Sequence, residues 1–112
     1  FPGSELKLLK GLQLGCSGII TATCNATAEL SRKVYDDFFS GKEQSYNQKL
    51  CEVRKNFDKY NLISGLHTFY SKENKIYENI LPPLRLLNAN EQKDLIDNLN
   101  NLDFKLNSKM AA

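Results

Sequence analysis

Residues 14–25 read LGCSGIITATCN and include the one stretch of this chain that is patterned as a β-strand. From Gly18 to Thr23 the residues are largely apolar and partly β-branched, with little alternation of strongly polar side chains. That pattern is typical of a short strand buried on both faces of a parallel sheet. A helical pattern precedes it, and a helix followed by a buried strand is the second half of a repeating α/β unit.

No other stretch of the 112 residues is patterned as a strand. The backbone N–H and C=O groups of a buried strand need partners on both sides. We therefore expect the strands that pair with Gly18–Thr23 to lie outside this sequence or in another copy of it. The sequence also begins abruptly at Phe1, and we expect it to be the C-terminal part of a longer protein.

The rest of the chain is predicted to be helical. The expected helices share apolar residues at helical spacing and a polar cap or a glycine at one end, and their ranges are 4–15, 28–40, 42–60, 62–71 and a last helix after residue 88. Asn88 and Glu91 have the spacing of a capping box. In 42–60, residues spaced by four and three predict a seam for a neighbouring helix, formed by Tyr46, Leu50, Val53, Phe57 and Tyr60.

Composition and charge argue against several classes of protein. The formal net charge is +2 and acidic residues are interspersed among the basic ones, so nucleic acid is not expected as a partner. No apolar run has transmembrane length and no signal-peptide pattern is present, so we expect no membrane partner and a cytoplasmic location. The three cysteines make neither a disulfide framework nor a zinc site, and His67 has no partner ligands, so we expect free thiols, no metal and no cofactor.

Several motifs, in order along the chain, resemble those of the dihydrodipicolinate synthase / N-acetylneuraminate lyase family. FPGSE (1–5) and a leucine-rich helix precede a stretch similar to the eighth strand of that family, and the matching residues are Gly15, Gly18, Ile20, Thr21, Thr23 and Asn25. SGKEQSYNQKL (40–50) resembles the family's helix junction, and ILPPLRLLNANEQKDL (80–95) resembles its Pro-Pro-Leu ending. The resemblance covers nearly the whole chain in register.

This resemblance implies an α/β fold, namely a (β/α)8 TIM barrel with a C-terminal three-helix extension. The chain would hold the tip of strand seven, helix seven, strand eight, helix eight and the extension, so that as given it is mostly α with one strand. The implied domains are the end of the barrel at 1–41 and the helical extension at 42–112. Strand one and the body of strand seven would then pair with Gly18–Thr23.

The resemblance also implies the chemistry of class I aldolases, in which a lysine forms a Schiff base with pyruvate or another 2-keto acid. Such a lysine needs a partly desolvated site, whereas the 12 lysines of this chain fall on polar helix faces, in loops or in the tail. We therefore expect the catalytic lysine to lie outside this chain, no catalytic residue within it, and no activity of the chain alone. The implied partners are pyruvate or a 2-keto acid as substrate, the N-terminal part of the barrel, and further copies in a homo-oligomer, commonly a tetramer.

Part of the substrate pocket would lie in this chain, because barrel active sites form at the C-terminal ends of the strands. By the resemblance, Gly3, Ser4 and Glu5 would contact hydroxyls on the distal part of the substrate, and Ile20 would line the pyruvate end. Ala22 offers no hydroxyl where sialic-acid-cleaving members can have a serine, which argues against that substrate. Gly3-Ser4-Glu5 also departs from the double-acid or Asn-Asp pattern of the family's lysine-pathway synthases, so the resemblance favours a 2-keto-3-deoxy sugar acid aldolase or an unassigned relative. A structural interpretation of Ser4 and Glu5, as a helix cap and a first-turn carboxylate, stays open beside the functional one.

A different class of function is a small stand-alone helical module that binds a protein partner. The expected helices from Ala28 onward could pack without a barrel, and the Tyr46–Tyr60 seam would then bind the partner. The strand-like stretch Gly18–Thr23 argues against this alternative, because a helical module has no use for it.

Overall fold

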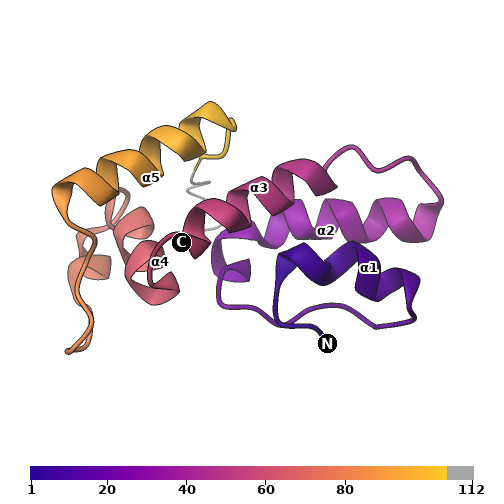
Figure 1. Cartoon of the computed structure of the whole chain (residues 1–112), viewed down its shortest axis with the longest axis horizontal. Helices are drawn as coiled ribbons and strands as arrows, with labels where there is room; N and C mark the ends of the chain where they lie inside the picture. Colours follow the sequence, from indigo (N-terminus) through magenta and orange to yellow (C-terminus); the bar gives the residue numbers. More distant parts are fainter. Residues whose placement is uncertain (106–112) are drawn as a thin grey trace. The chain divides into compact units, whose positions relative to one another are not determined.

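The computed structural model describes residues 1–105, and within them the chain forms five α-helices, two short 3₁₀ turns and no β-strand (Figure 1). In chain order these elements are η1 (Glu5–Lys7), α1 (Leu8–Gln13), α2 (Cys24–Ser40), α3 (Asn47–Asp58), α4 (Leu62–Ser71), η2 (Lys75–Glu78) and α5 (Ala89–Asn101). The helices were predicted correctly in number and order. None of those in residues 1–105 has the length and apolar character that crossing a bilayer demands.

Local sequence signals set the ends of several helices as predicted. Helix α4 spans Leu62–Ser71, and Asn61 caps it by accepting hydrogen bonds from two backbone N–H groups. Gly41 ends α2 with a φ of +70°, a conformation that costs glycine little. Asn88 and Glu91 form the predicted capping box of α5.

Two helix starts differ from the prediction. Helix α2 begins at Cys24 and not at Ala28, because the Thr21 hydroxyl accepts a hydrogen bond from the Cys24 backbone N–H at 3.0 Å and supports an earlier first turn. Helix α3 begins at Asn47 and not at residue 42. The Gln44 side chain, which lies before it, donates a hydrogen bond to the Val34 carbonyl at 3.2 Å, so that this part of the chain is tied to α2.

The prediction of a strand at Gly18–Thr23 is wrong for the part of the chain that the structure describes. Residues 16–21 carry no regular secondary structure. A backbone hydrogen bond from the Cys16 N–H to the Gly11 carbonyl, at 2.8 Å, closes the end of α1, and one from the Ile20 N–H to the Pro2 carbonyl, at 3.2 Å, joins this segment to another extended stretch. One bond does not make a ladder, because a strand needs a neighbour over several residues. The apolar composition was interpreted as a strand, but a strand also requires partners that these residues do not supply.

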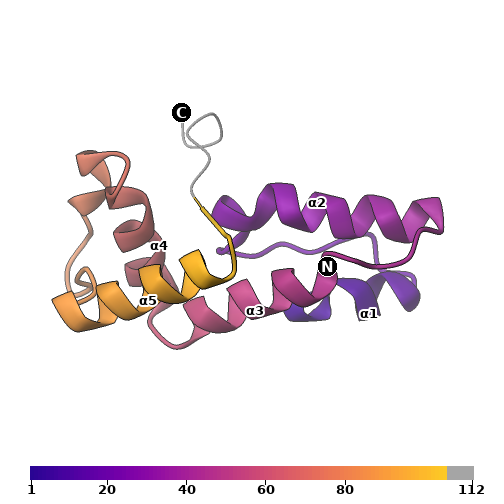
Figure 2. The same ribbon diagram turned by 90° about the horizontal axis from the view of Figure 1, so that it is seen from above.

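Residues 1–54 form one compact unit of the chain. Helix α1 packs on α2, and Figures 1 and 2 show the segment that follows α1 running back to the start of α2. A helix, an extended segment and a second helix follow one another here, in the order that helix, strand and helix have in repeating α/β units. Apolar side chains from the three helices are buried in this unit, namely Leu8, Leu12, Leu30, Val34, Leu50 and Val53.

Residues 55–105 form the second compact unit. Here α4 packs on α5 and on η2, and the buried apolar side chains are Phe57, Leu66, Phe69, Leu95 and Leu99. The buried hydroxyl of Thr68 accepts a hydrogen bond from the Leu87 backbone N–H at 3.0 Å and so ties the segment before α5 to α4. The division of the two units falls within α3, and the barrel boundary expected at residues 41 and 42 stays a prediction.

Candidate functional site

The two segments predicted to line a substrate pocket lie next to each other. The Ile20 N–H donates to the Pro2 carbonyl, and a Cβ added to Gly3 would lie 4.0 Å from the Ile20 carbonyl oxygen. Gly3 and Ala22 are exposed, and Ile20 has 72% of its surface exposed. The structure therefore places the four residues in two adjoining segments, with Gly3 and Ser4 in one and Ile20 and Ala22 in the other.

Ser4 has the structural role that its position predicted. It is the N-cap of η1, and its Oγ accepts a hydrogen bond from the Leu6 backbone N–H at 3.2 Å. Its side chain is half-buried, and it follows the exposed Gly3 directly. A cap of this kind fixes the backbone where the N-terminal segment turns into η1.

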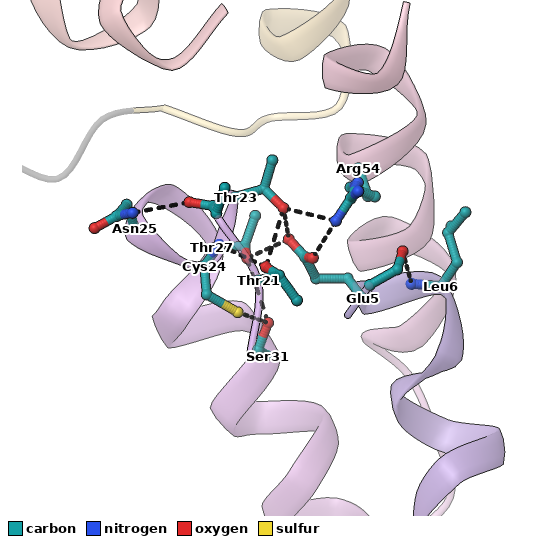
Figure 3. Close-up of polar contacts among 11 residues, drawn as sticks. Glu5, Leu6, Thr21, Thr23, Cys24, Asn25, Thr27, Ser31 and Arg54 are labelled. Carbon is teal, nitrogen blue, oxygen red and sulfur yellow. Dashed lines mark hydrogen bonds and ion pairs between the residues drawn. The ribbon is translucent and has the colours of Figure 1, made fainter. Parts of the chain in front are cut away.

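Glu5 is different from the other four predicted site residues, because it is fully buried. Its Oε2 accepts hydrogen bonds from the hydroxyls of Thr23 and Thr27, at 2.5 and 2.8 Å. Its Oε1 accepts one from Nη1 of Arg54 at 2.9 Å (Figure 3). Both carboxylate oxygens are thus bound by the protein itself.

Arg54 completes a closed cluster of three elements. Its Nη1 also donates to the Thr23 hydroxyl at 3.1 Å, so that one nitrogen binds Glu5 and Thr23 together. Arg54 and Glu5 form an ion pair in which the arginine side chain is 10% exposed and the glutamate side chain is 0% exposed. Thr23 precedes α2, Arg54 lies on α3 and Glu5 begins η1, and we call Glu5, Thr23, Thr27 and Arg54 the buried clamp.

The environment of Glu5 keeps its carboxylate ionised. Burial raises the pKa of this group, but hydrogen bonds from the hydroxyls of Thr23, Thr21 and Thr27 lower it, and the net pKa lies below the ordinary value of 4.5. A carboxylate that is buried, ionised and bound at both oxygens is a poor proton acceptor for a substrate. The structure therefore supports a role for Glu5 as a structural anchor. Its predicted contact with the substrate stays a prediction.

Sequence reasoning missed three members of the buried clamp, although each had a signal. Arg54 lies 49 residues from Glu5 but sits four residues after Leu50 and three before Phe57, which places a charge on an apolar helix face. Thr23 and Thr27 are four residues apart and share one face at the start of α2. A charge among core residues and paired hydroxyls together point to a buried polar cluster.

The described residues offer few other groups that could act in catalysis or bind a metal. No lysine of residues 1–105 is buried, and these residues hold no group of three or more metal-ligating side chains. Nδ1 of His67 lies 2.8 Å from the Tyr77 carbonyl, which suits a structural histidine. The thiols of Cys16, Cys24 and Cys51 are half-buried and form no disulfide within the described residues.

Comparison with models of protein families assigns nearly the whole chain to one family. The model of the Dihydrodipicolinate synthetase family matches residues 1–102, so the match includes both compact units. The chain belongs to this family, as its motifs indicated. A search of curated proteins and a search of solved structures each gave no significant match.

Proposed function

We propose that this chain is the C-terminal part of a pyruvate-dependent aldolase or lyase that works through a Schiff base. Residues 1–41 would form the end of a (β/α)8 barrel, and the remaining helices would form the extension that follows it. The family match supports this proposal. The observation that carries it is the extended, outward-facing segment around Ile20, which lies beside Pro2 and Gly3 as the eighth strand of a barrel lies beside the seventh.

In this proposal Gly3, Ser4, Ile20 and Ala22 contribute one wall of the substrate pocket. The exposure of Gly3, Ile20 and Ala22 supports the assignment, because a pocket wall must be open to the substrate. Ser4 is half-buried and directly follows Gly3. Ala22 brings no hydroxyl to this wall. We therefore favour a 2-keto-3-deoxy sugar acid as the substrate class.

The lysine that forms the Schiff base would come from a part of the protein outside this chain. A lysine becomes nucleophilic at neutral pH when desolvation lowers its pKa, and no lysine of the described residues is buried. The chain alone would then be inactive. Its partners would be the N-terminal part of the barrel and further copies of the whole enzyme, in the cytoplasm.

The test is the intact mass of the natively expressed gene product, before and after treatment with pyruvate and borohydride. We expect a product about two and a half times as long as this chain, since a TIM barrel takes roughly 250 residues, that gains one reduced pyruvate. A matched control omits pyruvate. A natural product of 112 residues that gains no adduct would refute the proposal.

The alternative, a helical module that binds a partner through the seam of α3, has less support. The middle of that seam is Leu50, Val53 and Phe57, and each of these side chains is fully buried in this chain. A seam that is already covered leaves a partner only the tyrosines at its ends, Tyr46 and Tyr60.

A further inference from the structure

The guanidinium of Arg54 holds two backbone segments that carry the proposed pocket wall. It binds Glu5 Oε1 at 2.9 Å and Thr23 Oγ1 at 3.1 Å. Glu5 directly follows Ser4, and Thr23 directly follows Ala22. Each acceptor is therefore one residue away from a residue of the wall.

The clamp is closed, and this makes it more than a single ion pair. The Thr23 hydroxyl accepts from Arg54 while it donates to Glu5 Oε2, and Thr27 donates to the same carboxylate oxygen (Figure 3). With both of its oxygens bound, the Glu5 carboxylate stays in the interior of this unit.

We propose that Arg54 is a positioning residue, which fixes Ser4 and Ala22 in the pocket wall by binding Glu5 and Thr23. The inference rests on the proposed function, because these residues line a pocket only in the aldolase. Arg54 acts through its two acceptors, since its side chain is almost entirely buried. It lies on α3, beyond residues 1–41, so the helical extension would act on the end of the barrel.

The first experiment records backbone amide NMR spectra of the 112-residue chain as wild type, as Arg54→Met and as Arg32→Met. Arg32 is the matched control, because its ion pair with Asp36 lies on the surface with the arginine side chain 68% exposed. We expect Arg54→Met to shift the amide resonances of Ser4 and Ala22 and Arg32→Met to leave both in place. A folded Arg54→Met variant with wild-type resonances at both positions would overturn the inference.

Two further variants keep the inference testable if Arg54→Met does not fold. Arg54→Lys keeps the charge but lacks the planar guanidinium, and we expect it to restore part of the wild-type shifts. The double variant Glu5→Gln/Arg54→Met removes both charges, so it folds more readily than Arg54→Met. We still expect displaced resonances for Ser4 and Ala22 there, and wild-type resonances in the folded double variant would also overturn the inference.

The second experiment uses the gene product that contains this chain and separates the two proposals. We expect Arg54→Met to trap pyruvate with borohydride as the wild type does, since the Schiff-base lysine lies elsewhere. We expect its kcat/KM for cleavage of a 2-keto-3-deoxy sugar acid to fall by about tenfold or more, because small displacements of substrate-positioning groups have effects of that order. A wild type that traps no pyruvate refutes the proposed function, whereas an unchanged kcat/KM in a variant that traps pyruvate refutes the role of Arg54.

Discussion

At the scale of single residues, the main physical question is how a carboxylate can be fully buried. An ionised group without partners in the interior has a prohibitive desolvation cost, so buried charges are paired and hydrogen-bonded. Glu5 receives hydrogen bonds from Thr23 and Thr27, at the start of α2, and from Arg54, on α3. The clamp therefore connects the N-terminal segment, α2 and α3 through one carboxylate.

Replacing one partner of the Glu5–Arg54 ion pair should lower the free energy of unfolding much more than replacing both partners. Arg54→Met leaves the Glu5 carboxylate buried without its counter-charge, and we expect a loss of about 3–5 kcal/mol in the free energy of unfolding. Glu5→Gln/Arg54→Met should lose less than the sum of the two single variants. Urea denaturation of the four proteins gives the coupling energy directly. Additive losses would show that the two side chains do not interact.

The lowered pKa of Glu5 also predicts a dependence of stability on pH. Since the folded pKa lies below the ordinary value of 4.5, the carboxylate stabilises the fold fully above that value, and the contribution is lost as pH falls through the folded pKa. The difference in free energy of unfolding between the wild type and Glu5→Gln should therefore be largest near pH 7 and shrink toward pH 3. Urea denaturation across this range measures it, with Glu29→Gln, at an exposed position of α2, as the control. A difference that grows as the pH falls would contradict the assignment.

At the scale of helices, local signals act within a few residues and can be tested one at a time. In α5 the Asn88 side chain accepts a hydrogen bond from the Glu91 N–H at 2.9 Å, and the Glu91 side chain accepts one from the Asn88 N–H at 3.2 Å. We expect Asn88→Ala to lower the free energy of unfolding by about 1 kcal/mol. The matched control is Asn90→Ala, which replaces an exposed asparagine two residues further on. Equal midpoints of urea denaturation for the two variants would show that the capping box contributes nothing.

The same distinction between local and distant causes explains which elements could be predicted. The range of α4 and the cap of α5 follow from neighbouring residues, and both were predicted from the sequence. The start of α2 was missed because the prediction relied on the spacing of apolar residues. The hydrogen bond from the Cys24 N–H to the Thr21 hydroxyl supports an earlier first turn. Arg54 was missed as a partner of Glu5 because nothing local specifies a contact over 49 residues.

At the scale of the whole molecule, the extended segment depends on distant partners. Ile20 exposes 72% of its surface, and the segment makes one backbone hydrogen bond to another extended stretch, at Pro2. Its composition predicts burial on both faces, and so the sequence and the structure of this chain disagree on its environment. In the proposed barrel, neighbouring strands would pair with the backbone of the segment, while Ile20 and Ala22 would stay open to the substrate pocket.

Removing residues 1–22 tests how far the helices depend on the N-terminal segments. The deletion takes away Glu5 and leaves Arg54 without its carboxylate, and we expect the shortened chain to unfold at lower urea than the whole chain. Arg54→Met should then have a much smaller effect than in the whole chain, below about 1 kcal/mol, because no buried carboxylate is left unpaired. Circular dichroism during urea denaturation measures both effects.

The two outcomes of this deletion separate the barrel fragment from the helical module. In a barrel fragment, α2 and α3 are held by the clamp to a segment that belongs to the sheet, so losing that segment weakens them. In a self-sufficient helical module the segment adds nothing, and the shortened chain keeps the stability of the whole one. If Arg54→Met destabilised both forms equally, Glu5 would not be the partner that makes Arg54 necessary, and the clamp would have no part in joining the helices to the barrel.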